Sequence, residues 1–521
     1  MKQSQRHNLD VFVVALALVL SACAMPERSA ETALQQVSVS ELEEVFTAGY
    51  TSITEKYIYS TTVENVAMDG LRGFGAIDPA ITLRRGSGFV TFAVDGTDLA
   101  RKPAPAVDNI RGWAALTAEF AKHTHRQSSE MQSTDSERIY EVVFDGVLSN
   151  LDIFSRYAGA AEAMKNRAKR DGFGGIGIRF KFENGAATVS DVMPGTPAQR
   201  AGLMRNDVIT HIDRIALKGL DANEVVSRMR GPTHTKVQLM VLRLDKNVAR
   251  QFEIKRTHII PTTVTAKLEN GILFLKVSNF NQGTSDSVAA ELEKAKQDGK
   301  LLRGLVIDLR GNPGGLLKQS VKLANLLLTQ GHIITTHGRH PDSLNHYEAG
   351  GRDFTGGAPV IVLIDGQSAS ASEIVAAALQ DRNRAIVIGT TSFGKGTVQT
   401  VIRLPNDGEI TLTWSRLVAP SGYTLHGLGV RPAICTSDHE GDIGSLIASA
   451  IADRLEIKAT LESWRTPGMQ EEARRQELRE SCPSQRRRQD VEARAAQYIL
   501  GDAALYDRVL DLSVATNQAR N

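Results

Sequence analysis

The sequence predicts a multidomain α/β protein, and three features support this fold class. The chain has 521 residues, enough for several domains that each bury a hydrophobic core. Between residues 258 and 435, apolar segments of strand length alternate with segments of helical periodicity, which is the pattern of an α/β layer. Helical periodicity also marks the N-terminal region and the tail at residues 436–521.

The first residues have the pattern of an export signal. Basic residues precede an apolar run from Val11 to Leu20, which is too short to cross a bilayer as a mature helix. The run ends in Leu-Ser-Ala-Cys, which resembles the lipobox of bacterial lipoproteins. We therefore expect residues 1–23 to be a lipoprotein signal peptide, with Cys23 as the lipidated residue. An ordinary signal peptide with an incidental cysteine is the alternative.

The expected location follows from this signal. A lipidated Cys23 would anchor the protein to a membrane of the bacterial periplasm. Ala24 is not an aspartate, and by the rule for enteric bacteria this favours the outer membrane.

Residues 24–170 are predicted to form a polar tether followed by a helical region. From Ser40 onward, apolar residues recur at helical spacing, which predicts an amphipathic helix. Its apolar face comprises Leu42, Val45, Phe46 and Tyr50. The segment from Gly86 to Asp108 is strand-like and then proline-rich, and the sequence assigns no role to it.

The predicted core at residues 258–435 takes its α/β class from the order of its elements. The glycine-rich segment at residues 310–315 and the loop at residues 389–396 each follow a short apolar run, as loops at strand ends do. Strands are expected at Ile272–Val277, Leu305–Leu309, Val360–Ile364, Ala385–Ile388 and Thr411–Leu417, and helices at Ser285–Gln297, from Leu316 and after Ser370.

Three residues of this core suggest chemistry. Ser370 opens an S-x-x-E capping pattern ahead of an apolar helix, where free backbone N–H groups can stabilise an oxyanion. A serine nucleophile needs a base, and Lys395 can supply one if burial keeps its amine neutral. Gln399 could hold that amine in place. Taken singly, each residue has a simpler explanation: a helix cap, a solvated loop lysine and a strand residue.

The motifs that contain these residues point to one family. Residues 368–381, SASASEIVAAALQD, and residues 393–399, FGKGTVQ, closely resemble the carboxyl-terminal processing peptidases of serine peptidase family S41. The resemblance implies a crotonase-like α/β sandwich and a catalytic set of Ser370, Lys395 and Gln399. It also implies that the DLRGNPGG loop, with Gly314 and Gly315, and the N–H of Ala371 form the oxyanion hole. His426 is expected to be structural, because the dyad is complete without it.

Residues 150–157, NLDIFSRY, resemble the LDPHSxY segment that precedes the next domain in this family, but they lack its proline.

Residues 171–257 resemble a PDZ domain, which is β-rich with two helices. The resemblance implies that backbone N–H groups of a glycine loop hold a peptide's terminal carboxylate, and that a strand edge accepts the peptide. A small β-domain with a glycine turn is the alternative. The residues expected to bind the peptide are Gly175, Ile176, Gly177 and Ile178 in the loop and strand, and Val225 and Met229 on the second helix.

Two cysteines remain in the expected mature chain, Cys435 and Cys482. An exported protein with an even number of cysteines favours a disulfide, and two separate buried thiols are the alternative. Such a bridge would pin the charged helical tail to the core. The tail could be a brace or an oligomerisation element.

Composition excludes several other classes. Lys and Arg total 61 against 59 for Asp and Glu, so nothing favours nucleic acid. No Cys/His cluster has metal-ligand spacing, and we expect no metal and no other cofactor. Residues 389–397 resemble a phosphate-binding loop with the threonine one place late, but an exported chain would meet little nucleotide.

We therefore expect a lipid-anchored periplasmic serine endopeptidase that binds apolar C-terminal tails of exported proteins and cleaves them. A non-catalytic PDZ lipoprotein scaffold that binds protein C-termini is the alternative, although a scaffold has no need of Ser370, Lys395 and Gln399 together. Homo-oligomers and an activating adaptor remain open at this point.

Overall fold

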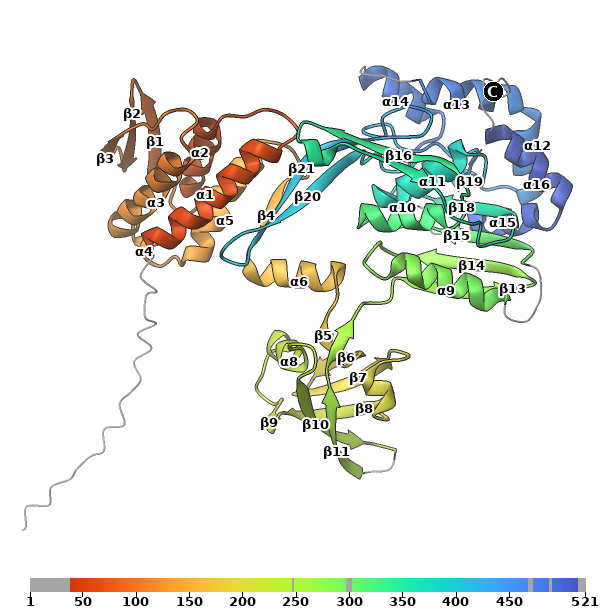
Figure 1. Ribbon diagram of the computed structural model, residues 1–521, viewed down its shortest axis with the longest axis horizontal. Coiled ribbons are helices and arrows are strands. Elements are labelled where there is room, and N and C mark those ends of the chain that lie inside the picture. The colour runs from red at the N-terminus through yellow and green to blue at the C-terminus, as the bar shows by residue number, and fades with distance from the viewer. Residues whose placement is uncertain (1–37, 246–247, 297–301, 467–471, 487–489, 514–521) are drawn as a thin grey trace, which may run out of the picture.

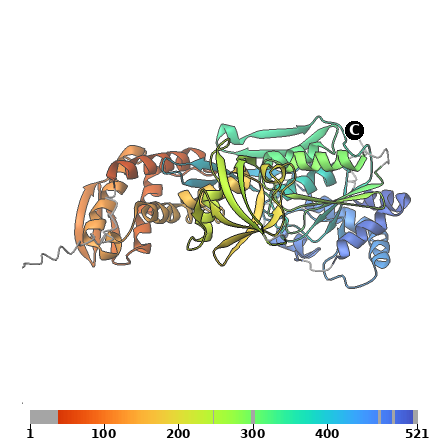
Figure 2. The ribbon, with the colours of Figure 1, turned by 90° about the horizontal axis from the view of Figure 1, so that it is seen from below.

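The computed structural model describes residues 38–245, 248–296, 302–466, 472–486 and 490–513. The predicted lipidation site, Cys23, lies outside these ranges. Figure 1 shows an N-terminal bundle, a small β-domain, a central α/β core and a C-terminal group of helices. Figure 2 shows the bundle and the C-terminal helices at opposite ends of the long axis. Among the described residues, no helix combines the length and the hydropathy needed to span a bilayer.

The N-terminal bundle confirms the predicted helical region. Its helices share one hydrophobic core, and the predicted apolar face of the first helix is buried in it. A capping serine, Ser38, accepts the N–H of Glu41 and begins that helix. The helices are α1 (Val39–Lys56), α2 (Val63–Arg72), α3 (Ile110–Gln127), α4 (Ser129–Gln132) and α5 (Ser136–Leu148).

The same region also contains a sheet, which the prediction of a helical region had not included. Three antiparallel strands bury Val90 and Phe92 against the bundle, because alternate residues of the middle strand face its core. The unassigned segment from Gly86 to Asp108 supplies two of the strands. They are β1 (Ile81–Gly86), β2 (Phe89–Val94) and β3 (Thr97–Pro103).

A long hairpin joins the bundle to the core. Its strands, β20 (Thr397–Arg403) and β21 (Glu409–Val418), run between the core and the bundle, and Ile410 and Leu412 near its tip are buried in the bundle (Figure 1). Strand β21 also pairs with β4 (Arg156–Ala158), which is followed by helix α6. That helix spans Ala160–Arg170.

The small β-domain is a sheet with strand order β11-β10-β8-β7-β6 and two short helices. Asp221 and Glu224 form a capping box at the start of the second helix. A two-stranded stem of β5 (Phe173–Gly175) and β12 (Thr257–Ile259) connects the domain to the rest. The domain's elements are β6 (Ile178–Glu183), β7 (Ala186–Val192), α7 (Pro197–Arg200), β8 (Asp207–Ile212), β9 (Ile215–Ala216), α8 (Ala222–Met229), β10 (Lys236–Arg243) and β11 (Val248–Lys255).

The core contains a mostly parallel sheet with strand order β13-β14-β15-β18-β19-β22. Both faces are buried: Leu305 and Ile307 pack on one side, and Val306 packs on the other. This explains why its strands are continuous apolar runs, as predicted. The strands are β13 (Val264–Glu269), β14 (Ile272–Val277), β15 (Gly304–Asp308), β18 (Val360–Ile364), β19 (Ile386–Gly389) and β22 (Ile434–Cys435).

One face of this sheet packs against three helices and a second sheet of order β17-β16-β21-β20. The predicted helices of the core are all present, and the third begins directly after Ser370. These elements are α9 (Thr284–Lys296), α10 (Leu317–Asn325), α11 (Ala371–Asp381), β16 (Gly331–Gly338) and β17 (Asn345–Ala349).

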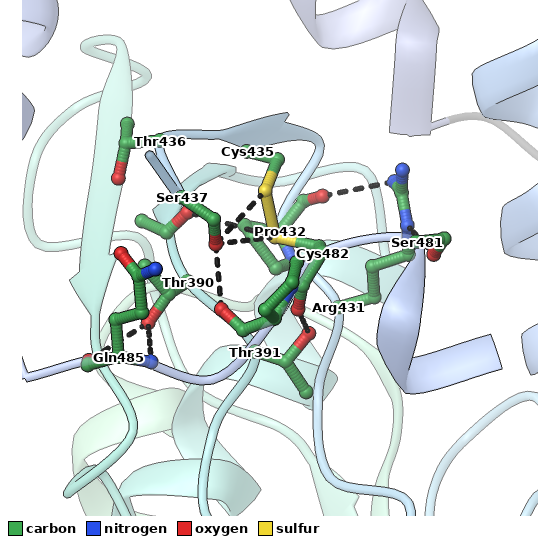
Figure 3. The surroundings of a disulfide bond; sticks show 12 residues. Thr390, Thr391, Arg431, Pro432, Cys435, Thr436, Ser437, Ser481, Cys482 and Gln485 are labelled. Atoms are coloured by element: carbon green, nitrogen blue, oxygen red, sulfur yellow. Dashed lines mark hydrogen bonds between the residues drawn. A yellow bond between two sulfur atoms is a disulfide. The ribbon is translucent and has the colours of Figure 1, made fainter. Parts of the chain in front are cut away.

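The tail helices cover the other face. Three of them pack their apolar sides on Ile361 and Ile388 of the sheet, so the tail braces the core. The predicted bridge between Cys435 and Cys482 is present. Figure 3 shows it beside the loop that contains Thr391, whose hydroxyl donates to the carbonyl of Cys482 at 2.6 Å. The tail helices are α12 (Ile443–Ala452), α13 (Arg454–Trp464), α14 (Glu472–Glu480), α15 (Val491–Leu500) and α16 (Ala503–Leu510).

Candidate active site

Ser370 occupies a strained turn between strand β18 and helix α11. Its φ of +54° is uncommon for a residue other than glycine. The turn is packed against the glycine-rich loop after β15: a Cβ on Gly314 would lie 2.9 Å from Ser370 Cβ and 2.7 Å from the carbonyl oxygen of Ala369. Ser370 and Glu373 form a capping box at the start of the helix, in which Glu373 accepts the backbone N–H of Ser370 at 2.7 Å. The serine is therefore fixed at the helix start, where it lines a cavity.

Two backbone N–H groups beside Ser370 have no partner within the described residues. One belongs to Ala371, at the first position of helix α11, and the other belongs to Gly315. The N–H of Gly314, by contrast, donates to Asn312 Oδ1 at 2.9 Å. Of the three predicted oxyanion residues, Ala371 and Gly315 thus have free donors, and Gly314 contributes the close approach.

A buried carboxylate joins the serine turn to the lysine loop. Glu373 is fully buried, and its Oε2 accepts the backbone N–H groups of Ser370 at 2.7 Å and Lys395 at 3.0 Å. Its Oε1 accepts from Gly394 N at 2.7 Å and from the Ser392 hydroxyl. Burial raises the pKa of this carboxyl, while the hydrogen bonds favour its ionised form. The sequence indicated Glu373 only as a capping residue.

Lys395 is partly buried in the loop before β20. Burial is the largest cause that lowers the pKa of its amine, and the nearby Arg156 is the second. The amine nitrogen lies 4.9 Å from the centroid of the Phe154 ring. Burial and the positive charge of Arg156 both favour the neutral amine, which is the form that a general base requires.

The segment that supplies Phe154 and Arg156 is one that sequence analysis did not place at the site. Asp152 shapes it by accepting the N–H groups of Phe154 at 2.7 Å and Ser155 at 2.9 Å. Asp152 Oδ1 also accepts the Thr413 hydroxyl at 3.0 Å, which ties the segment to β21. The similarity to the LDPHSxY segment was the available signal. The side chain of His426 lies edge-on to Phe154, with ring centroids 6.3 Å apart.

Gln399 lines the same cavity from strand β20. Its Nε2 donates to the hydroxyls of Thr397 at 3.0 Å and Thr413 at 3.3 Å. Its amide oxygen has no hydrogen-bond partner within the described part of the chain and is available to an amine.

The site opens into a cavity of about 320 Å³ that is lined by Ser370, Lys395 and Gln399 together. A second cavity of about 500 Å³ continues from it and shares Gln399 and Glu409 as lining residues. The walls of the second cavity include Leu316, Leu317, Tyr347, Val398 and Trp414. An extended polypeptide could therefore pass the serine with apolar side chains on one side.

The predicted peptide-binding residues of the β-domain lie near one another. The side chains of Ile176, Val225 and Met229 are buried in the domain's core. Strand β6, which begins at Ile178, is an edge of the sheet. The N–H groups of Ile176 and Gly177 have no partner among the described residues, whereas Gly175 pairs with β12.

Comparison with known proteins assigns the class. The model of peptidase family S41 matches residues 271–436, and a PDZ domain model matches residues 188–243. A carboxy-terminal-processing protease from Bartonella bacilliformis is 39% identical over 303 residues, which cover 58% of this chain and 70% of the relative. A probable CtpA-like serine protease from Staphylococcus aureus is 32% identical over 314 residues, 59% of this chain and 62% of the relative.

The similar solved structures include C-terminal processing proteases, at lower sequence identity. The photosystem II D1 C-terminal processing protease is 23% identical, with a TM-score of 0.34, over 70% of this chain and 92% of that one. The peptide-bound PDZ domain of the Vibrio cholerae carboxy-terminal protease is 24% identical, with a TM-score of 0.16, over 17% of this chain and 96% of that one.

Fold and site together define a serine-type peptidase with a PDZ domain. The chain belongs to peptidase family S41, the family of the carboxy-terminal-processing proteases.

Proposed function

We propose that this chain is an endopeptidase that uses a Ser370–Lys395 dyad to cleave exported proteins that it recognises by their C-termini. One observation carries the proposal: both residues line one cavity, and the buried Glu373 binds the backbone N–H of each. A single rigid anchor for the nucleophile and its base is what a fixed catalytic geometry requires.

The reaction begins with proton transfer. Neutral Lys395 removes the proton from the Ser370 hydroxyl as its oxygen attacks the scissile carbonyl. The N–H groups of Ala371 and Gly315 stabilise the negative oxygen that forms. Lys395 then donates its proton to the leaving amine, and water hydrolyses the acyl-enzyme with Lys395 again as the base.

Gln399 orients the base. Its Nε2 is anchored by two threonine hydroxyls, so the amide oxygen is fixed in the cavity and can accept a hydrogen bond from the Lys395 amine. This arrangement favours one orientation of the lone pair of the amine, toward Ser370.

The PDZ domain selects substrates by their C-termini. The free N–H groups of Ile176 and Gly177 are suited to a terminal carboxylate, and the edge of β6 is suited to an added peptide strand. Because Val225 and Met229 are buried, a peptide's apolar side chain would enter only after a small shift of helix α8.

The protein acts in the bacterial periplasm, lipid-anchored through Cys23, with the outer membrane favoured. The signal-like N-terminus supports this location, and so does the disulfide, because disulfides persist in oxidising compartments. Incorporation of a labelled fatty acid by the wild type but not by Cys23→Ser tests the anchor, and membrane fractionation tests the choice of membrane. If Cys23→Ser still incorporates the labelled fatty acid, lipidation at Cys23 is refuted.

The function is tested with full-length protein in detergent and an unfolded protein that ends in apolar residues. Mass spectrometry of the products is compared for wild type, Ser370→Ala and Lys395→Ala, with circular dichroism as the folding control. We expect cleavage by wild type alone and slower cleavage when the substrate's C-terminus is amidated. Binding of the tail without cleavage by wild type would instead support a non-catalytic scaffold.

A further inference from the structure

The cavity around Ser370 carries an excess of positive charge. Its charged lining residues are Arg156, Lys169, Arg170, Lys395 and Glu409. They come from β4, from the last turn of α6, from the loop before β20 and from β21, so segments distant in the sequence converge there.

The one carboxylate among these lining residues is already neutralised. Glu409 is 4% exposed, and it accepts Arg167 at 3.0 Å and Arg170 at 3.2 Å in ion pairs. Arg156 and Lys169 have no ion pair within the described ranges, and both are exposed to the cavity. Two cations therefore remain uncompensated beside the nucleophile.

The dipole of helix α6 and the lowered pKa of Lys395 explain the presence of these two cations only in part. The C-terminal turn of α6 favours basic residues through the helix dipole, which accounts for the charge of Lys169 but not for its position beside Arg156. Arg156 helps to lower the pKa of Lys395, but Lys169 is not among the causes of that shift. Cations that line a cleft with low-dielectric walls focus a positive potential in it, and such a cleft concentrates anionic groups.

We propose that Arg156 and Lys169 form a subsite for an acidic side chain of the substrate close to the scissile bond. This inference rests on the proposed function, since it assumes that Ser370 cleaves peptides. A side chain fits better than a chain terminus, because the cavity continues past Gln399 into the second, apolar cavity and so admits a polypeptide that extends beyond the site. The preferred substrates have an aspartate or glutamate next to apolar residues.

Charge complementarity at this subsite should make the enzyme prefer substrates with an acidic side chain. A glutamate that reaches Lys169 and Arg156 gains charge-assisted hydrogen bonds that a glutamine of the same shape makes less well. The gain is screened by salt, because the subsite is open to solvent on one side.

The test uses full-length protein and a set of peptides that share one apolar C-terminus. Each peptide has glutamate or glutamine at one of three positions on either side of the cleaved bond, and kcat/KM is measured at low and high salt. We expect glutamate to exceed glutamine about tenfold at one position or more at low salt, with a smaller ratio at high salt.

Matched variants test whether the glutamate-to-glutamine ratio of kcat/KM depends on Arg156 and Lys169. Lys169→Gln is compared with Lys165→Gln, which removes an exposed lysine of the same helix that does not line the cavity. We expect the first variant to reduce the ratio to about threefold or less and the second to leave it unchanged. Arg156→Gln should also reduce the ratio, and it should shift the acid limb of the pH profile upward as well.

The outcomes separate the two hypotheses. Equal rates for glutamate and glutamine at every position, or equal effects of the two lysine variants, overturn the acidic subsite and leave the proposed function intact. If wild type cleaves no peptide of the set, the proposed function falls and the subsite with it.

Discussion

The amine nitrogen of Lys395 lies 4.9 Å from the centroid of the Phe154 ring. The ring has two opposing effects on the amine: it excludes water, which disfavours the ammonium, and its π face attracts the ammonium. Burial is the largest cause that lowers the pKa of Lys395, and the ring covers part of the amine. The contact therefore favours the neutral form of the lysine through its share of that burial.

Substitution of Phe154 should shift the pH dependence of cleavage in a direction that depends on the new residue. The active form is the neutral amine, so activity rises as the pH rises through the pKa of Lys395. Phe154→Ala admits water, raises that pKa and moves the acid limb of kcat/KM to higher pH. Phe154→Leu keeps water out and removes the π face, so its acid limb stays at the wild-type position or moves lower.

Ile153→Ala is the control, because the neighbouring Ile153 is 89% exposed and belongs to the same turn. Its profile should match that of wild type. An upward shift of the same size in Phe154→Ala and Phe154→Leu would contradict the shielding role of the ring.

Glu373→Gln should abolish most activity. Each carboxylate oxygen of Glu373 accepts two donors, and the amide group of glutamine would direct its own N–H groups at one of these pairs. The serine turn and the lysine loop then lose their common anchor, and we expect kcat to fall by about 100-fold or more. Steady-state kinetics on the folded variant measures the loss.

The matched control is Glu224→Gln. Glu224 occupies the same position of a capping box on helix α8, where it is exposed and accepts the N–H of Asp221 at 3.2 Å. It should change thermal stability slightly and kcat hardly at all. Similar losses in both variants would show that general helix destabilisation is the cause.

Gly314→Ala should separate crowding from backbone strain. The new Cβ would meet the Ala369 carbonyl oxygen at 2.7 Å and Ser370 Cβ at 2.9 Å, so the serine turn must move. We expect a fall in kcat of about 100-fold, because displacements of this size spoil attack geometry. Gly356→Ala also replaces a glycine of positive φ, but with nothing within 4 Å of the new Cβ, and it should leave kcat unchanged. A normal kcat in Gly314→Ala would refute the idea that the glycine is needed for close packing against the serine turn.

The double substitution of Cys435 and Cys482 by serine should lower both stability and activity. The bridge closes a loop with a sequence separation of 47, and its loss should cost about 2–4 kcal/mol in the free energy of unfolding. Activity should fall because the Cys482 carbonyl holds Thr391 of the lysine loop. Denaturant unfolding and kinetics measure the two effects, and wild type with a reductant should reproduce both. An unchanged kcat would mean that the loop is held without the bridge.

The sequence carried the local elements of the core and pointed to Ser370, Lys395 and Gln399, which line one cavity. The runs at Val360–Ile364 and Ala385–Ile388 are buried on both faces, and such strands show in the sequence as continuous apolar segments. The capping pattern at Ser370 located the helix start, because caps depend on neighbouring residues.

The parts that could not be predicted depend on contacts between distant segments. Phe154 and Arg156 reach Lys395 only because β4 pairs with β21, and no local pattern encodes that pairing. Among the described residues, the N–H of Gly315 is free and that of Gly314 is not, because Gly314 donates to the side chain of Asn312. A local pattern does not show this difference. The segment from Gly86 to Asp108 was strand-like in the sequence, but its pairing into a sheet against the bundle depends on contacts that no local pattern encodes.

The position of the tail helices also determines when the lysine loop gains its last contacts during synthesis. Helix α14 lies beyond the catalytic residues in the chain, and its Arg479 binds the carbonyls of Leu428 at 2.6 Å and Ser392 at 3.1 Å, beside Lys395. During synthesis, Ser370 and Lys395 therefore emerge about a hundred residues before the segment that fastens their loop. A chain that stops before α14 lacks these two hydrogen bonds, so we expect its lysine loop to be held less firmly.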